Sequence, residues 1–389
     1  MQANRKALLS GLLGLAVLLP GCVRLDGQRL SWFHDEAADV LQIVLNYDGV
    51  HDSGDDRHGR GVEQIPEFVR DDSVMLLDWP LHRQLKKMRE ATGSPGQSAH
   101  DNARTERIAE LAKTVRVEPI GHYREPNGKL GAAQLITIPN AQSFVKTVNS
   151  LLNAQIVEDR AFRLKHSPEQ PVPKTLERIE TAAKTEHQWI RLDGQAIRVV
   201  VPVHPGEWKA QKIQFAAELA EKLSKGFGEK PDETRLGLQR FFRFVAASPL
   251  SYIERDDEIE IMVGRTKSAT TLRATLRDAY EPSLEAVLVE QVPVDLDQRL
   301  ADALLDAENE PSAPVAAVLK FGPPEDQVRA LLVAFEKDDV ERRVEVSTRL
   351  NRWAAEWNRN HVVPAAPTAT TPDDDLAAWK QWYVKMRGL

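Results

Sequence analysis

The sequence has one cysteine in 389 residues, Cys22. A disulfide within the chain is therefore excluded, and the folded state depends on its core for stability. Four local signatures of catalysis are missing too: the serine elbow Gly-x-Ser-x-Gly, the zinc motif His-Glu-x-x-His, the phosphate-binding loop and the glycine pattern of dinucleotide binding. A Cys-x-x-Cys redox pair is excluded by the lone cysteine. The chain thus carries no local signature of these enzyme classes.

Long apolar runs and basic tracts are missing from the chain beyond its N-terminus. Hydrophobic residues make up 42 % and charged residues 28 %, which is the composition of an ordinary globular protein. No later apolar run approaches the roughly 17–25 residues of a membrane-spanning helix. Acidic residues outnumber basic ones by 58 to 51. This excess disfavours contact with nucleic acid, and we expect no nucleic-acid partner.

The N-terminus has the three parts of an export signal. Arg5 and Lys6 are basic, residues 7–19 form an apolar stretch of thirteen residues, and Gly21 directly precedes Cys22. Two alternatives are weaker. The stretch is short for an uncleaved spanning anchor, and a plain secretory signal would leave an unpaired thiol in an oxidising compartment. The run of Leu, Pro, Gly and Cys that ends at Cys22 instead resembles the lipobox of bacterial lipoproteins.

This resemblance implies a lipid anchor on Cys22. The chain would be cut after residue 21, a diacylglycerol would be attached to the sulfur, and the new amino group would be acylated. The departure from the lipobox pattern is Pro20, where a small or β-branched residue is commoner. Two or three acyl chains on one residue make an effectively permanent anchor. Val23 stands where lipoproteins retained in the inner membrane have Asp, which favours the periplasmic face of the outer membrane if the cell has two membranes.

Removal of the signal leaves 368 of the 389 residues and takes two basic residues with it, so the net charge changes from −7 to −9. A chain of this length is long enough for one large or two ordinary domains. We expect an N-terminal α+β region at 22–166 and a second α+β region at 167–360. The proline-rich run 167–173 is either the joint between two domains or a loop within one.

A β-hairpin followed by a helix recurs along the mature chain. Turn signals stand between alternating strands at Asn127-Gly128, at Asp193-Gly194 and more faintly at Asp256-Asp257. The segments expected to follow these three hairpins as helices are 140–153, 207–225 and 271–277. A fourth hairpin is expected at the start of the mature chain, because residues 24–28 repeat residues 191–195 letter for letter. The repeat reflects either internal duplication or a common turn.

These patterns predict an α+β fold class, in which antiparallel β-hairpins are each followed by helices packed on the sheet. A strand is expected at 39–47. Further helices are expected at 102–113, 175–184, 232–246 and 323–336.

An acidic loop at 48–61 is the strongest candidate for a metal site. It interleaves carboxylates and imidazoles with glycines, namely Asp48, His51, Asp52, Asp55, Asp56 and His58. Such side chains could gather calcium or zinc. The spacing fits no calcium-loop pattern, however, and such a loop is usually solvated. We therefore expect no metal and no cofactor. The run 34–36, His-Asp-Glu, indicates a polar strand entry rather than a proton relay.

The C-terminus combines a tether with an amphipathic helix. Residues 361–375 form a tether rich in Pro, Ala and Thr, and 376–389 form the amphipathic segment. A cap at Thr371 and a proline at the first helical position predict a helix over residues 372–387. Its apolar face consists of Leu376, Trp379, Tyr383 and Met386. A helix this short is marginal alone, so this face must dock. We expect it to dock on the body of the same chain, with an envelope protein partner as the alternative.

Together these observations predict a membrane-anchored cell-envelope lipoprotein with a non-catalytic binding or scaffolding role. Membrane contact would come through the lipid on Cys22. The alternative is an envelope hydrolase or metal-dependent enzyme that uses the acidic loop 48–61, because acid/base sites assembled from distant residues leave no local signature.

Overall fold

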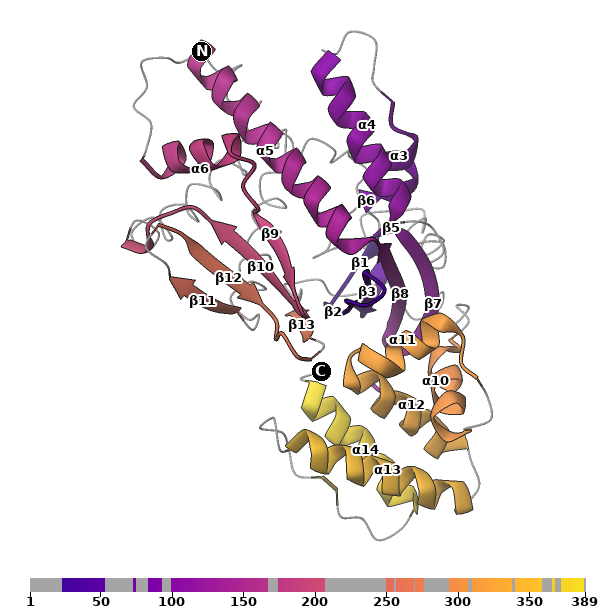
Figure 1. Cartoon of the computed structure of the whole chain (residues 1–389). Coiled ribbons are helices and arrows are strands. Elements are labelled where there is room, and N and C mark those ends of the chain that lie inside the picture. Colours follow the sequence, from indigo (N-terminus) through magenta and orange to yellow (C-terminus); the bar gives the residue numbers. More distant parts are fainter. Residues whose placement is uncertain are drawn as a thin grey trace.

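The computed structural model describes most of the chain from Val23 to Arg387. The described residues are 23–52, 73–74, 83–92, 99–166, 174–206, 250–254, 257–268, 270–275, 294–306, 310–337, 340–358, 366–367 and 372–387. They form an α+β fold with two antiparallel sheets and helices against them (Figure 1). The expected fold class is therefore confirmed. The helices expected at 207–225 and 232–246 lie outside the described residues.

A five-stranded antiparallel sheet is the centre of the molecule, with the strand order β13-β2-β3-β8-β7. Its strands are β2 (Gly27–Asp35), β3 (Val40–Asp48), β7 (Arg116–Arg124), β8 (Leu130–Pro139) and β13 (Thr270–Thr275). β2 and β3 form one hairpin and β7 and β8 another, and β3 pairs with β8 between them. The last strand in the sequence, β13, pairs with β2 and forms one edge of the sheet. The strand pairing therefore joins the two regions expected at 22–166 and 167–360.

The two faces of this sheet belong to separate cores, because successive side chains of a strand point to opposite faces. On β3, Leu45 lies in the first core and Val44 in the second core, and both are fully buried. On β8 the same division separates Ile136 from Leu135. Both faces are covered, so the central strands bury apolar side chains on both sides.

A four-stranded antiparallel sheet docks on the first core. It has the order β11-β12-β10-β9 and consists of β9 (Ile190–Asp193), β10 (Ala196–Val201), β11 (Leu250–Glu254) and β12 (Ile259–Val263). Its β9–β10 turn contacts the central sheet through Gln195. The Gln195 side chain accepts from the His34 backbone N–H at 2.8 Å and donates to the His34 carbonyl at 2.6 Å. The Trp32 indole donates to the Gln195 carbonyl at 2.7 Å.

Helices and short strands complete this half of the molecule. α5 (Ala141–His166) and α6 (Lys174–Lys184) pack on each other, and α5 lies beside β9 (Figure 1). α3 (Leu85–Glu90) and α4 (Ala99–Thr114) contribute Leu85 and Ala112 to the first core. β1 (Val23–Arg24) pairs with β4 (His51–Asp52), and β5 (Ser73–Val74) pairs with β6 (Arg83–Gln84).

A layer of five helices covers the other face of the central sheet. They are α10 (Leu296–Leu305), α11 (Ala313–Phe321), α12 (Pro324–Lys337), α13 (Val340–Asn358) and α14 (Pro372–Arg387). In Figure 1 they form the orange to yellow part, and the C-terminal end of α14 points toward the sheet. Their apolar side chains share one core with Val44 and Leu135 of the sheet.

The C-terminal helix docks on the body of the same chain, as expected. α14 begins at Pro372, the proline that the sequence places at the first helical position, and ends at Arg387. Trp379 is 1 % exposed and Tyr383 is fully buried. Trp382, which the predicted apolar face did not include, is also buried and stacks edge-on against Trp353 and Trp379 at centroid distances of 5.9 and 5.3 Å. A partner that used this aromatic face would have to displace α14.

Three of the predicted hairpins were confirmed, the third by the antiparallel pairing of β11 with β12, and two expectations were wrong. Gly128 and Gly194 lie in the turns between their strands, with φ of 84° and 57°. The segment expected as a helix at 271–277 is instead strand β13, because it pairs with β2. The hairpin expected at residues 24–28 does not form, because β1 pairs with β4 and β2 with β3 around a turn at 36–39.

The two turn glycines offer a matched test of hairpin geometry. Both have positive φ, which costs a residue with a Cβ about 1–2 kcal/mol. A Cβ at Gly194 would lie 2.4 Å from the Thr266 carbonyl oxygen, whereas nothing lies within 4 Å of a Cβ at Gly128. We expect Gly194→Ala to lower the free energy of unfolding by about 2–3 kcal/mol and Gly128→Ala by about half as much. Urea unfolding measures both. Equal losses would contradict the close approach of Thr266.

Candidate functional site: a buried ion network

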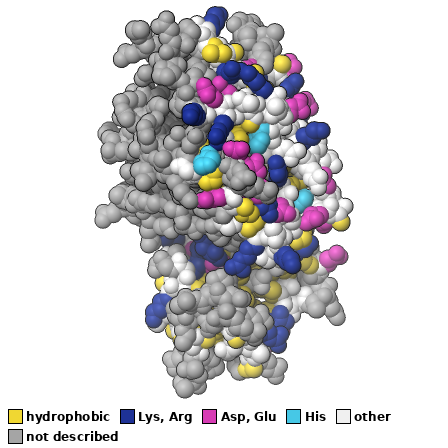
Figure 2. All heavy atoms as spheres, turned by 60° about the vertical axis from the view of Figure 1, so that its left-hand side comes forward, with side chains coloured by type: hydrophobic (Ala, Val, Ile, Leu, Met, Phe, Trp, Pro, Cys, Tyr) yellow, Lys and Arg dark blue, Asp and Glu magenta, His cyan; other side chains and the backbone are white. Residues whose placement is uncertain are grey.

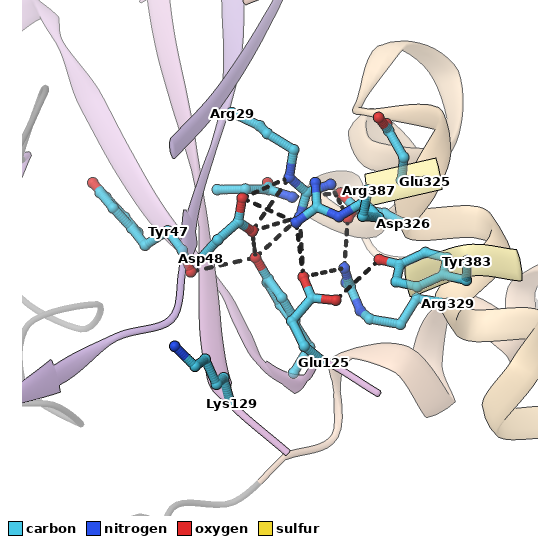
Figure 3. A network of polar contacts seen from close by, with 12 residues as sticks. Arg29, Tyr47, Asp48, Glu125, Lys129, Glu325, Asp326, Arg329, Tyr383 and Arg387 are labelled. Carbon is cyan, nitrogen blue, oxygen red and sulfur yellow. Dashed lines mark hydrogen bonds and ion pairs between the residues drawn. The ribbon is translucent and has the colours of Figure 1, made fainter. Parts of the chain in front are cut away.

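A network of charged side chains lies buried between the central sheet and the helical layer (Figure 3). The sheet side contributes Arg29 from β2, Asp48 from the end of β3, Tyr123 from β7 and Glu125 directly after it, and the helices contribute Asp297 from α10, Asp326 and Arg329 from α12, and Tyr383 and Arg387 from α14. The charged side chains among them are at most 9 % exposed. Three strands and three helices therefore meet in one interior cluster of charges.

Strand alternation places the sheet residues on this face. Arg29 lies directly opposite Asn46 across the β2–β3 pair, and Asp48 follows Asn46 by two positions. All three side chains consequently point to the helical side of the sheet. On the helical side, Asp326 belongs to the first turn of α12, where the helix dipole favours a carboxylate.

Arg29 is the first hub of the network. Its Nη2 donates to Asp48 Oδ1 at 2.8 Å and its Nε donates to Asp48 Oδ2 at 3.0 Å. Its Nη1 donates to Asp326 Oδ1 at 2.8 Å, and its Nη2 also reaches the Tyr123 hydroxyl oxygen at 3.1 Å. The forked guanidinium of one side chain thereby joins two strands to α12.

Arg329 is the second hub. Its Nε donates to both oxygens of Asp297 at 2.9 and 3.0 Å, and its Nη1 donates to Asp326 Oδ1 at 2.7 Å. The guanidinium also lies over the Tyr123 ring, 3.5 Å from the centroid. Asp326 is consequently shared by both arginines, and its second oxygen accepts from the Asn46 amide at 2.5 Å.

Arg387 brings the C-terminal helix into the network. Its Nη2 lies 3.1 Å from Asp48 Oδ2 and 3.0 Å from Glu125 Oε1. The Tyr383 hydroxyl donates to the other oxygen of Glu125 at 3.1 Å. At the border of the cluster, Arg273 of β13 donates to Glu325 of α12 at 2.6 and 3.0 Å.

The carboxylates of this network differ in their pKa values. Burial alone would raise the pKa of Asp48, but Arg29 and Arg387 outweigh it and hold the pKa far below the usual range. Asp326 behaves in the same way between Arg29 and Arg329, and its pKa is lowered. Burial raises the pKa of Asp297 to about 6, because Arg329 only partly offsets it and Asp326 adds to the rise. Asp297 therefore holds its proton more tightly than the other two carboxylates.

The network is suited to holding two layers together. Its members contact one another at hydrogen-bonding distances and are sealed from solvent, so a substrate does not reach them in this conformation. A buried ion pair contributes little net stability compared with apolar packing, but its geometry is exacting and the loss of one partner is costly. We interpret the cluster as the element that sets the position of the helical layer on the sheet.

The residues predicted from the sequence as a site lie apart from one another or outside the described part. Cys22 precedes the first described residue, Val23. Asp48 was expected in the acidic loop, which is wrong: it is the last residue of β3 and is bound by Arg29, because the strand continues one residue further than predicted. His51 and Asp52 form strand β4, and residues 53–61 lie outside the described residues.

His34, from the polar run at 34–36, is buried in β2, with Nδ1 3.3 Å from the Gly194 carbonyl oxygen. Within the described ranges, no cluster of three or more His, Cys, Asp or Glu side chains is arranged to hold a metal ion. No described helix is both long and apolar enough to cross a bilayer.

Sequence reasoning missed the network itself. Arg29 and Asp326 are 297 positions apart. The only available signals were a charged residue at an inward position of an alternating strand and a carboxylate in a first helical turn. From the neighbouring residues alone, both side chains would be predicted to face solvent. No protein-family model, no curated protein and no solved structure matches the chain.

Loss of one hub should be far more costly than loss of a surface cation. Arg329→Ala leaves Asp297 and Asp326 without a shared partner in the interior, and we expect it to lower the free energy of unfolding by about 3–5 kcal/mol. The matched control is Lys113→Ala, which breaks an exposed pair with Glu110 and should cost no more than about 1 kcal/mol. Chemical unfolding measures the free energy of unfolding of both variants. If the two variants lose similar amounts, the network does not have this structural role.

The raised pKa of Asp297 predicts a pH-dependent stability. The folded state keeps the Asp297 proton up to about pH 6, whereas the unfolded chain releases it near its ordinary pKa of 3.8. Stability therefore falls as the pH rises through this window, by about 2–3 kcal/mol relative to the non-titrating variant Asp297→Asn. Urea unfolding between about pH 4 and 7 measures the difference. Asp295→Asn, at an exposed position just before α10, is the control and should follow the parent.

Proposed function

We propose that this protein is a cell-envelope lipoprotein, anchored to the membrane through Cys22, that acts by binding or scaffolding. The observation that carries the proposal is the N-terminal pattern of basic residues, an apolar stretch, Gly21 and the only cysteine of the sequence, Cys22. The run predicts a mature chain that begins at Cys22, and the first strand, β1, begins at Val23.

The organisation of the body supports a binding role rather than chemistry at the network. The buried group of ionisable side chains around Arg29 and Arg329 joins the sheet to the helical layer. The described part of the face in Figure 2 mixes basic and acidic side chains, with hydrophobic side chains in small separate areas. A mixed surface of this kind suits polar contacts with a partner in the envelope. The enzyme alternative counted Asp48 among the groups of the acidic loop, but the Asp48 carboxylate is already bound by Arg29.

Replacement of Cys22 tests the anchor. Cys22→Ser removes the sulfur that would carry the diacylglycerol, and we expect an unprocessed precursor with no incorporation of labelled palmitate. Labelling of growing cells, followed by purification and gel analysis, measures both. The matched control places a thiol inside the apolar run, as Ser10→Cys in the Cys22→Ser background, and should not restore labelling.

Two outcomes would contradict parts of the proposal. If Cys22→Ser still matures and incorporates label, the chain is not a lipoprotein of the kind proposed. If the parent is lipidated but crosslinking in intact cells recovers no envelope component beyond that found with a lipidated control protein, the anchor stands and the binding role fails.

A further inference from the structure

The N-terminal strand leaves almost no spacer between Cys22 and the folded body. Val23 pairs with Asp52 in the β1–β4 ladder, and the Asp26 N–H donates to the Asp48 carbonyl at 2.9 Å. Since consecutive Cα atoms are about 3.8 Å apart, an anchor on Cys22 lies one peptide unit from the first residue of the two-stranded β1–β4 sheet. A body attached so closely cannot swing freely on a flexible linker.

The pairing register shows which end of the central sheet the anchor adjoins. Gly27 at the start of β2 lies opposite Asp48, and Val50 donates its N–H to the Leu130 carbonyl at the start of β8. Asp26 also forms an ion pair with Lys129 in the β7–β8 turn. Residues 23–26 and the turn at 125–129 are therefore neighbours. We call this part of the molecule the anchor end.

The C-terminal helix reaches the same end. Arg387, the last residue of α14, contacts Asp48 and Glu125, which stand beside the β7–β8 turn. Lys385, two residues earlier, is exposed. Both termini of the described chain thus converge on the anchor end.

Three described basic side chains at the anchor end reach solvent, and one partly exposed carboxylate, Asp26, lies among them. Lys385 is exposed, and Arg124 and Lys129 are partly exposed. Of the nearby acidic groups, Asp26 is paired with Lys129, whereas Asp48 and Glu125 are buried against Arg387. The mature chain as a whole has a net charge of −9, two units below the −7 of the full sequence. Anionic headgroups would repel such a body in most orientations and tolerate this end.

We propose that the anchor end rests on the surface of an anionic bilayer, so that the sheet stands upright on the membrane. The inference rests on the proposed lipidation of Cys22. The β2–β3 turn at 36–39 is then the distal end, about 25–30 Å away along the strands. The four-stranded sheet joins the central sheet through Trp32 and His34, near that distal turn, and is held away from the lipid.

Two labelling positions at opposite ends of the sheet test this orientation. Asn127 in the β7–β8 turn and Ala37 in the β2–β3 turn are both exposed. Each is changed to Cys in the full-length lipidated protein, labelled with bimane and reconstituted in vesicles of phosphatidylglycerol and phosphatidylcholine that contain headgroup-nitroxide lipid. We expect loss of most of the fluorescence for Asn127→Cys and retention of most of it for Ala37→Cys. A Gly/Ser insertion of about 15 residues between Cys22 and Val23 should abolish the difference, because it adds a reach of roughly 20 Å.

Charge reversal tests the electrostatic part. Lys385→Glu should reduce the quenching at position 127 on anionic vesicles, and the control Lys113→Glu, at the end of α4 beside the start of β7, should not. Equal quenching at positions 37 and 127 in the parent, or stronger quenching at 37, would overturn the proposed orientation. If the parent incorporates no palmitate, the lipoprotein proposal itself fails, and the two failures are thereby distinguished.

Discussion

The position of the helical layer depends on one carboxylate, Asp326, that two arginines share. Arg29 reaches it from the sheet at 2.8 Å and Arg329 reaches it from within α12 at 2.7 Å. Neither guanidinium could be left in this interior without a counter-ion, because an unpaired buried charge costs several kcal/mol. The apolar residues around them supply the driving force for packing, but many packings would bury a similar area. The shared carboxylate selects the one in which α12 begins directly over Asn46.

The same constraint makes the C-terminal helix part of the core. Without Arg387, the described network would hold four carboxylates, Asp48, Glu125, Asp297 and Asp326, against the two remaining arginines. With Arg387 docked, Asp48 and Glu125 each gain a cation at about 3 Å. The remaining acidic excess falls on Asp297, whose pKa burial raises to about 6. Docking of α14 therefore has two causes: burial of Trp379 and Tyr383, and neutralisation of the charges beneath them.

The network and the proposed membrane anchor occupy the same end of the central sheet. Asp26 lies four residues after Cys22, and its backbone N–H donates to the carbonyl of Asp48, the last residue of β3. Glu125 is the first residue of the β7–β8 turn. Arg387 then joins the last turn of the described chain to both. If Cys22 carries lipid, the buried ion network lies at the end of the sheet nearest the bilayer. The four-stranded sheet, docked through Gln195, then lies farther from the bilayer.

The sequence alone determined the features that depend on neighbouring residues. The turns at Gly128 and Gly194 follow from the tolerance of glycine for positive φ, and α14 follows from its cap, its proline and its spacing of aromatic residues. The proposed export signal likewise rests on a local pattern. Tertiary structure decided the rest. Residues 270–275 became a strand only because β2 offered an edge, and Asp48 became a buried partner only because Arg29 faced it. Sequence patterns place a charged side chain in solvent unless its counter-charge is also known. Here the counter-charge lies as far as 297 residues away along the chain. It could not be predicted, because the energy of an ion pair depends on the distance in space and not on the distance along the chain.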